Sequence, residues 1–386
     1  MKTENKLLEV AKVFFKLGLF AFGGPAAHIS MMEDEVVTKR KWMSRQHYLD
    51  LIGATNLIPG PNSTEMTMHC GHERAGFKGL FIAGISFILP AVVTTGLLAY
   101  VYVEYGELPN IKPFFYGIKP AVLAVIASAI LKLGKKAIKT GELVFLGVLV
   151  LGLSLAGINE IVVLLGTGII GAFYFYTKHK VTTSTKSIIP LFILNIGLSG
   201  LTKLTTINVF YTFLKVGSIL YGSGYVLFAY LKVELVETGF MTNQQLLDAI
   251  AMGQFTPGPV LSTATFIGYQ LTGIWGALAA SLGIFLPSFL FVLLLNPLIP
   301  KMQKSKFLRG FLDSVNVAAV GIMIAVLFTM ARDTLFPVNI DYLTEFDWKA
   351  LVIVTISATL VFGFKKVNVM WTILGGAALG YVLHLF

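Results

Sequence analysis

Long apolar stretches separated by short polar loops dominate this chain, and they recur in the same order in its two halves. Two of these stretches, residues 79–103 and 276–300, contain no charged side chain and are long enough to cross about 30 Å of hydrocarbon. We therefore predict an all-α polytopic membrane protein. Four spans are expected in each half, near residues 79–103, 113–131, 143–159, 161–177, 276–300, 310–331, 350–364 and 367–385.

Each set of four spans is preceded by two broken apolar segments. The first of them, residues 7–29 and residues 207–231, is interrupted by glycines, and the second is interrupted by Pro-Gly-Pro at residues 59–61 and 257–259. Proline lacks the N–H that continues a helix and glycine relaxes the backbone, so one helix stops and another starts there. In hydrocarbon such a break is tolerated only where it is buried in protein or lines a cavity.

Local matches indicate that the second half is a duplicate of the first. Phe15-Lys16-Leu17-Gly18 corresponds to Leu214-Lys215-Val216-Gly217, and Phe87-Ile88-Leu89-Pro90 corresponds to Ile284-Phe285-Leu286-Pro287. We divide the chain into a first repeat (residues 1–180), a linking apolar segment (residues 181–203) and a second repeat (residues 204–386). The apolar part of the link, residues 188–201, would supply an odd membrane crossing.

Loop charges predict that the two repeats lie in opposite orientations. In the first half the loop before span 113–131 is mainly acidic and the loop after it is basic, and in the second half this order is reversed. By the positive-inside rule, equivalent loops then face opposite sides of the membrane. Inverted-topology repeats with broken helices at the repeat interface are typical of secondary transporters. Loop charges favour re-entrant hairpins for the Pro-Gly-Pro segments, with full spans as the alternative.

Composition narrows the class of protein. The 386 residues are 55% hydrophobic and only 13% charged, about half the charged fraction of a soluble chain. The net charge of +10 lies mostly in short loops, so it indicates topology rather than nucleic-acid binding. A single cysteine, Cys70, excludes an intramolecular disulfide, and residues 69–73 do not match a metalloprotease motif. We expect no metal, no cofactor and no catalytic residue.

The Pro-Gly-Pro breaks are the leading candidates for a substrate site. A helix that begins after each break has unpaired N–H groups and the positive end of its dipole, and two such starts meeting would suit an oxyanion. A proline kink that only packs helices is the alternative. The candidate residues, including the glycine breaks, are Gly23, Gly24, Pro25, Asn56, Pro59, Gly60, Pro61, Asn62, Ser63, Thr64, Gly222, Ser223, Gly224, Gln254, Pro257, Gly258, Pro259, Ser262 and Thr263.

Ionisable residues inside apolar segments add further candidates. Lys16 and Lys215 occupy equivalent places, so two ammonium groups could balance a divalent anion; the alternative is that they extend to the membrane surface. Glu65, whose repeat counterpart is Thr263, is a candidate for coupling proton and anion movement, although we favour an ion pair with a nearby arginine or lysine such as Arg74.

Three further ionisable residues are weaker candidates. Lys119 has Asn316 as its counterpart and so lacks a basic partner in the other repeat. Asp50 and Asp248 occur in both halves just ahead of an apolar segment, where an acid favours a helix N-terminus.

Three motifs resemble those of the chromate ion transporter family in its long, two-domain form. They are Phe22-Gly23-Gly24-Pro25, Pro59-Gly60-Pro61 and Thr256-Pro257-Gly258-Pro259, and the resemblance covers essentially the whole chain. It implies chromate efflux and chromate resistance, with sulfate as the close structural mimic. It also places the family's motifs on the glycines and prolines just named. The second glycine break, Gly222-Ser223-Gly224-Tyr225, departs from the pattern because it lacks the proline.

The sequence therefore predicts a multi-pass secondary transporter of a tetrahedral divalent oxyanion in the cytoplasmic membrane. Its expected partners are chromate or sulfate and the lipid bilayer, with no nucleic acid, and a homo-oligomer is left open. The residues lead to an anion-suited site, whereas chromate as the anion follows from the resemblance alone. The alternatives are a sulfate or general oxyanion transporter and, more remotely, a membrane-embedded enzyme.

Overall fold

The computed structural model describes residues 5–22, 24–178, 205–220, 227–295, 305–337, 346–364 and 368–385, and all regular secondary structure within these ranges is helical. This confirms the predicted all-α class. Among the predicted features, the linking segment 188–201, Gly23 and residues 222–224 lie outside the described residues.

The helices follow the same order in both halves. The first half contains α1 (Lys6–Phe20), α2 (Pro25–Glu33), the π-helical turn η1 (Asp34–Lys39), α3 (Arg45–Thr55), α4 (Asn62–Tyr105), α5 (Lys112–Ala137), α6 (Gly141–Leu155) and α7 (Glu160–Lys178). The second half contains α8 (Thr206–Ile219), α9 (Leu227–Leu231), η3 (Lys232–Val236), α10 (Asn243–Phe255), η4 (Val260–Ser262), α11 (Thr263–Leu295), α13 (Lys306–Leu335), α14 (Trp348–Ala358), η6 (Thr359–Gly363) and α15 (Val369–His384). The eight predicted spans fall on α4–α7 and on α11–α15.

The helices have the length and composition of a multi-pass membrane protein. In the described residues, five helical segments are long and apolar enough to cross a bilayer: Asn62–Tyr105, Lys112–Ala137, Glu160–Lys178, Val260–Leu294 and Phe307–Leu335. Large apolar side chains such as Phe145, Ile170 and Trp275 are exposed on the outside of the bundle. This is the surface expected of a protein whose solvent is lipid.

The long helices α4 and α11 each turn back on themselves at the same place in the repeat. The turn falls at Ala75–Gly76 in α4 and at Thr272–Gly273 in α11, and both glycines have positive φ. On either side of the turn the two arms touch: Thr265 Oγ1 lies 2.7 Å from Ser281 Oγ, although these residues are 16 positions apart. Each long helix is therefore a pair of antiparallel arms. The predicted spans that begin near residues 79 and 276 correspond to the second arm of each pair.

The first Pro-Gly-Pro segment forms a helical hairpin. Its outer ends are joined by His47 at the start of α3 and Glu73 at the end of the first arm of α4, with Nε2 and Oε2 3.2 Å apart. At the other end of the hairpin, the side-chain amide of Asn62 donates to Asn56 Oδ1 at 2.7 Å across the break. This is the hairpin shape that the loop charges favour, with Pro59-Gly60-Pro61 at its tip.

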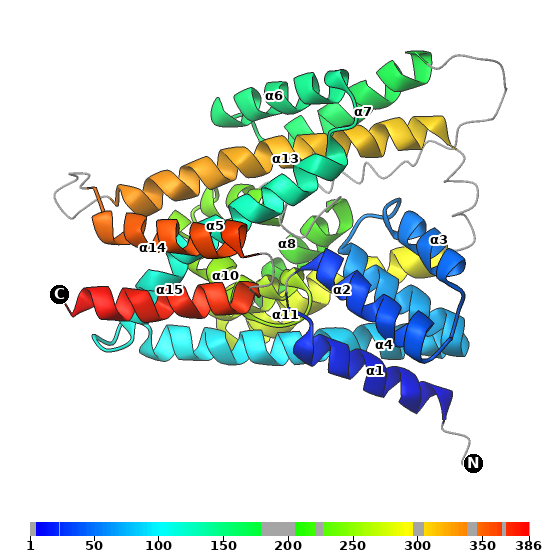
Figure 1. Ribbon diagram of the computed structural model, residues 1–386, viewed down its shortest axis with the longest axis horizontal. Helices are drawn as coiled ribbons and strands as arrows, with labels where there is room; N and C mark the ends of the chain where they lie inside the picture. The colour runs from blue at the N-terminus through cyan, green and yellow to red at the C-terminus, as the bar shows by residue number, and fades with distance from the viewer. Residues whose placement is uncertain are drawn as a thin grey trace.

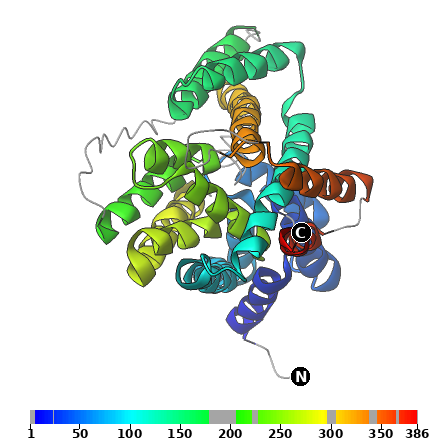
Figure 2. The same cartoon turned by 90° about the vertical axis from the view of Figure 1, so that its left-hand side faces the viewer.

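Helices of the two halves interlock rather than sit side by side. α1 packs on α4 and α8 on α11 within the repeats, whereas α5 packs on α14 and α15, and α13 packs on α6 and α7, across them. In Figure 1 α6, α7 and α13 lie together on one side of the molecule with α1 on the opposite side, and Figure 2 shows the same separation. Small residues allow the close approach: Gly117 meets Gly376, and Gly171 meets Ser314.

Candidate functional site

The two Pro-Gly-Pro tips are held by reciprocal hydrogen bonds between the repeats. The N–H of Gly60 donates to the carbonyl of Leu220 at 2.7 Å, and the N–H of Gly258 donates to the carbonyl of Ala21 at 2.9 Å. Leu220 ends α8 and Ala21 ends α1, at equivalent places in the two halves. In each case the tip glycine of one half binds the end of the first helix of the other half. Such a reciprocal contact is expected for two halves related by a two-fold axis.

Glycine is required at the centre of both tips. Gly60 has φ +134° and Gly258 has φ +86°, values that residues with a side chain rarely adopt. A Cβ at Gly60 would also collide with the Glu65 carboxyl group and lie 2.6 Å from Ser288 Oγ, and a Cβ at Gly258 would lie 2.8 Å from the Ala91 methyl group. The tips therefore place bare backbone against the opposite repeat.

The helices that start at the tips are not capped by side chains. Elsewhere Ser44, Thr205 and Thr242 accept hydrogen bonds from the first turns of α3, α8 and α10. At the tips, α4 follows Pro61 and η4 follows Pro259, and neither helix start has a side-chain cap. Uncapped N–H groups at the positive end of a helix form a ready site for an anion.

The first tip is surrounded by polar groups that lack partners. Glu65 is fully buried, and neither of its carboxyl oxygens has a hydrogen-bond partner among the described residues. Ser288, which comes from α11 of the other repeat, is equally buried and its hydroxyl is likewise unpartnered there. The hydroxyl of Thr64 shares both properties. Buried polar atoms without partners are rare in native proteins and call for a ligand, a proton or water.

The second tip is surrounded by paired hydroxyls instead. Thr95 of α4 has its hydroxyl 3.2 Å from both Thr256 Oγ1 and Ser262 Oγ.

His28 of α2 lies 3.0 Å from the Ala21 carbonyl that also accepts from Gly258, so its Nε2 is the donor. Its other ring nitrogen is buried and has no partner in the described residues. Neither Thr95 nor His28 was among the predicted site residues.

The remaining predicted site residues lie around the tips in different settings. Asn56 is exposed at the end of α3, whereas Ser63 and Thr263 are buried in the first helical turns beyond the tips. The side-chain amide of Gln254, on the last turn of α10, is buried with its nitrogen unpartnered among described residues. Gly24 has φ +83° and starts α2, which has Pro25 at its first position and no side-chain cap.

The two candidate lysines are each paired with a glutamate from the equivalent place in its repeat. Lys16 Nζ lies 3.6 Å from Glu35 Oε1, with 66% of the lysine side chain exposed. Lys215 donates to Glu234 Oε1 at 2.7 Å, with 28% exposed. The glutamates lie on the π-helical turns η1 and η3. The structure therefore gives each ammonium group a carboxylate partner, which the sequence did not anticipate.

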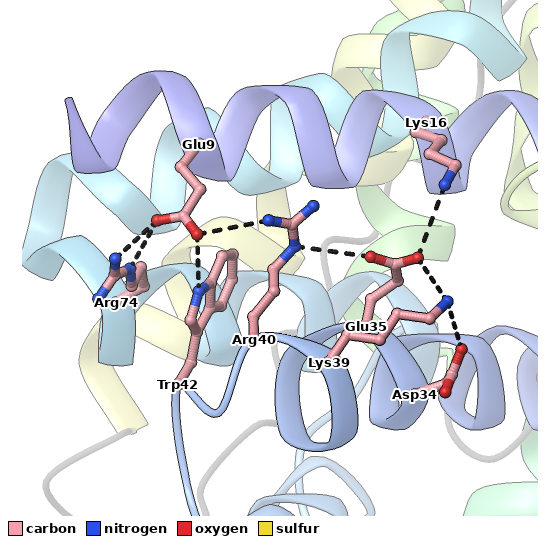
Figure 3. Close-up of polar contacts among 8 residues, drawn as sticks. All are labelled: Glu9, Lys16, Asp34, Glu35, Lys39, Arg40, Trp42 and Arg74. Carbon is pink, nitrogen blue, oxygen red and sulfur yellow. Dashed lines mark hydrogen bonds and ion pairs between the residues drawn. The ribbon is translucent and has the colours of Figure 1, made fainter. Parts of the chain in front are cut away.

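In the first repeat this pair belongs to a larger network of charges (Figure 3). Glu35 also contacts Lys39 at 3.1 Å and Arg40 at 3.5 Å, and Arg40 reaches Glu9. Burial acts to raise the pKa of Glu35, but the hydrogen bond from Lys39 and the surrounding positive charges outweigh it and hold that pKa below its usual value. The carboxylate therefore stays charged and ties η1 to α1.

The predicted ion pair between Glu65 and Arg74 is wrong. Arg74 instead binds Glu9 with two of its nitrogens, at 2.7 and 3.0 Å, and Glu9 accepts from Trp42 Nε1 as well (Figure 3). Arg74 lies at the base of the hairpin and Glu65 lies near its tip, so one side chain cannot serve both places. The sequence spacing of nine residues conceals this separation, because it corresponds to more than two helical turns.

The expectation that Asp248 favours a helix N-terminus is also wrong. Asp248 lies inside α10, where Thr242 is the cap, and it is buried against Lys119 Nζ at 2.8 Å and the Tyr102 hydroxyl. Lys119 and Tyr102 belong to the first repeat and Asp248 to the second, so the cluster joins the repeats. The only sequence feature that pointed to this cluster was Lys119, which precedes a proline in an apolar span.

Buried helix breaks, uncapped helix starts and interlocked repeats together define a polytopic membrane transporter built from two related halves. Comparison with known proteins identifies it further: the chain belongs to the chromate transporter family, whose model matches residues 8–172 and 207–381. No solved structure matches the chain. Membership agrees with the resemblance of the glycine and Pro-Gly-Pro motifs.

Individual relatives are similar over most of their length. A probable chromate transport protein of Synechococcus elongatus is 30% identical, over 85% of this chain and 86% of the relative. A chromate transport protein of Cupriavidus metallidurans is 28% identical over 98% and 93%, and one of Pseudomonas aeruginosa is 28% identical over 83% and 80%. These relatives are transport proteins rather than enzymes, so the alternative of a membrane-embedded enzyme is not favoured.

Proposed function

We propose that the protein exports chromate and binds it where the two Pro-Gly-Pro tips meet the opposite repeat. The observation that carries this proposal is the reciprocal pair of hydrogen bonds from Gly60 to Leu220 and from Gly258 to Ala21. It brings two uncapped helix starts to one repeat interface. Two positive helix ends are suited to a compact divalent oxyanion, whose oxygens accept hydrogen bonds from several directions.

Partnerless polar groups near the tips support a polar ligand there. The Thr64 hydroxyl and the Gln254 side-chain amide are buried donors without partners among the described residues. Both groups can donate to an oxyanion, and leaving such donors unsatisfied is costly. Chromate as that oxyanion follows from the family and from the names of the relatives, and sulfate, of the same shape and charge, is its natural competitor.

The lysines act in this proposal through their glutamates rather than as direct ligands. Each ion pair ties the first helix of a repeat to the π-helical turn that follows the glycine break: Lys16 with Glu35, and Lys215 with Glu234. Movement of one repeat against the other would open the tips to one side of the membrane and then to the other. Such pairs would hold the segments around each glycine break in place during that movement.

Outward movement of a dianion is favoured by a membrane potential that is negative inside. The potential supplies about 2.3 kcal/mol per elementary charge for each 100 mV, and twice that for two charges. Export therefore needs no ATP, in agreement with the lack of a Walker A motif in the sequence. The same driving force would confer chromate resistance on a cell that expresses the protein.

Chromate flux into and out of proteoliposomes tests this proposal. Purified protein would be reconstituted with the membrane potential clamped, and sulfate would be added as a competitor. Saturable chromate flux, driven outward by an inside-negative potential and weakly inhibited by sulfate, is the expected result. Faster flux of sulfate than of chromate would reassign the substrate, and no flux of either anion would contradict the proposal.

A further inference from the structure

The carboxyl group of Glu65 is an unusual feature of the first tip. It is fully buried in the first turn of α4, and both of its oxygens lack a hydrogen-bond partner among the described residues. A Cβ added at Gly60 would collide with Glu65 Oε1 and lie 2.6 Å from the Ser288 hydroxyl oxygen, so both groups border the same point beside Gly60. The hydroxyl of Ser288 is buried and unpartnered as well. Two polar groups from different repeats thus face one point at the tip.

Ionisable groups of the second repeat do not neutralise this carboxyl. α11, which carries Ser288, contains no charged residue along its whole length. α8, which ends at the Leu220 carbonyl bound to Gly60, has a single charged side chain, Lys215, and this is bonded to Glu234. Asp248 of α10 is bound by Lys119 and Tyr102.

Several ionisable groups of the first repeat are engaged elsewhere. On α3, Arg45 binds Glu33 at 2.9 Å, His47 binds Glu73, and Asp50 accepts from Gln46. On α2, His28 bonds the Ala21 carbonyl. On α1, Glu9 binds Arg74 and Lys16 binds Glu35. On α4 itself His69 lies one turn beyond Glu65; it is buried, and its Nε2 has no hydrogen-bond partner among the described residues. No charged partner for Glu65 appears in the described part of the chain.

An unpaired charge in such a place is costly, and a proton on the Glu65 carboxyl group would remove that cost. A dianion at the neighbouring helix start would be repelled by the ionised carboxylate and tolerated beside the neutral acid. Building on the proposed anion site, we propose that Glu65 and Ser288 form a proton-binding site that must be occupied before the oxyanion binds. One proton then travels with each dianion.

The charge balance of this cycle is simple. A proton from the water on one side binds the Glu65 carboxylate, the dianion binds at the tips, and both are released to the other side. Because one positive charge accompanies two negative charges, one net negative charge crosses the membrane in each cycle. A carrier of the bare dianion would move two net charges, and a proton antiporter would move three.

The number of charges that move with each chromate ion separates these cases. Chromate flux and electrical current would be measured together in proteoliposomes, in mildly alkaline buffer where chromate is a dianion. We expect one charge per chromate for the wild type and two for Glu65→Gln, which keeps the shape of the side chain but cannot release a proton. Glu104→Gln, on the exposed far end of α4, is the matched control and should keep a value of one.

The wild-type measurement decides the proposal even if the variant is unstable. A value of two or three charges for the wild type overturns the proton site, as does a value of one for an active Glu65→Gln protein. Absence of chromate flux in the wild type would instead overturn the proposed function, so the two failures can be told apart.

Anion binding at different pH values gives a second test. Sulfate is the probe, because its own charge does not change between mildly acidic and mildly alkaline solution. For one coupled proton, sulfate affinity should fall by about tenfold per pH unit once the Glu65 carboxyl ionises. Glu65→Gln should bind sulfate with the same affinity throughout. Equal pH dependence in wild type and Glu65→Gln would contradict the proposal.

Discussion

The two tips have a similar backbone arrangement, but different side chains surround them. Both place a glycine with positive φ against a carbonyl of the opposite repeat. Around Gly60 lie the unpartnered groups of Glu65 and Ser288, whereas Gly258 lies against the methyl group of Ala91. The similar backbone arrangement brings a helix start of each repeat to the proposed anion site. The difference assigns the proton to one repeat alone.

The same contrast extends to the base of each hairpin. In the first repeat Arg74 joins the hairpin to α1 through Glu9, and the network continues to Arg40 and Glu35. In the second repeat the residue equivalent to Arg74 is Leu271. The first hairpin is therefore tied by charge to its own repeat, whereas the buried ion pair of the second hairpin, between Asp248 of α10 and Lys119, ties it to the opposite repeat.

Replacing the tip glycines should have the largest effect. Alanine at Gly60 or Gly258 forces a side chain into a strained backbone and into contact with the opposite repeat. We expect each variant to lose chromate flux and about 3–5 kcal/mol of stability. Flux and thermal unfolding in detergent provide the measurement. Gly152→Ala in α6, where a Cβ meets no atom within 4 Å, is the control and should behave as wild type.

Exchanging the side chains that distinguish the tips should have the next largest effect. Thr263→Glu buries a second acid at a fully buried position that contacts Gly253, and we expect a loss of about 2–4 kcal/mol. Glu65→Thr should be milder and should abolish the pH dependence of sulfate binding. Both would be followed by thermal unfolding and sulfate binding. A stable Thr263→Glu protein would show that the two tips are less different than the structure indicates.

The lysines should differ although they occupy equivalent places. Lys215→Ala leaves the largely buried Glu234 without its 2.7 Å partner and should cost about 1–2 kcal/mol, with reduced flux. Lys16→Ala leaves Glu35 with Lys39 and Arg40 and should stay within about 0.5 kcal/mol of wild type. Thermal unfolding and flux measure both. A larger loss of chromate flux for Lys16→Ala than for Lys215→Ala would show that Lys16 contacts the anion directly.

The hydroxyl of Thr95 offers the smallest and most local change. Val292 stands at the equivalent position of the other repeat, so Thr95→Val makes the second tip resemble the first without changing the shape of the side chain. The variant loses contacts to Thr256 and Ser262 and should be less stable by about 1 kcal/mol, with flux retained. A complete loss of flux would place Thr95 in the anion site itself.

Much of the fold could be predicted from the sequence because apolar length and repetition are local properties. Segments such as residues 113–131 and 310–331 are apolar over most of their length, and α5 and α13 occupy them. Pro-Gly-Pro marks a helix break with little ambiguity, and both breaks are found at the tips. The turn at Gly76 falls between the Pro-Gly-Pro segment and the predicted span 79–103, but an isolated glycine in a polar loop did not fix its exact position.

Partners across the repeats could not be predicted. Ser288 and Glu65 border the same point beside Gly60, and Lys119 pairs with Asp248, although the two members of each pair lie more than a hundred residues apart in the sequence. Sequence reasoning instead chose Arg74 for Glu65, because it was the nearest cation along the chain. Which side chains meet in a membrane bundle depends on helix rotation and crossing, and small residues such as Gly117 set these through packing.

The decisive test of the proposed anion site is a structure of the chromate-bound protein in a lipid nanodisc, determined by electron microscopy. We expect density for one tetrahedral anion at the repeat interface, within hydrogen-bond distance of the first N–H groups of α4 or η4. Density beside Lys16 or Lys215 instead of at these helix starts would contradict the proposed site, as would a bound anion that contacts only one repeat.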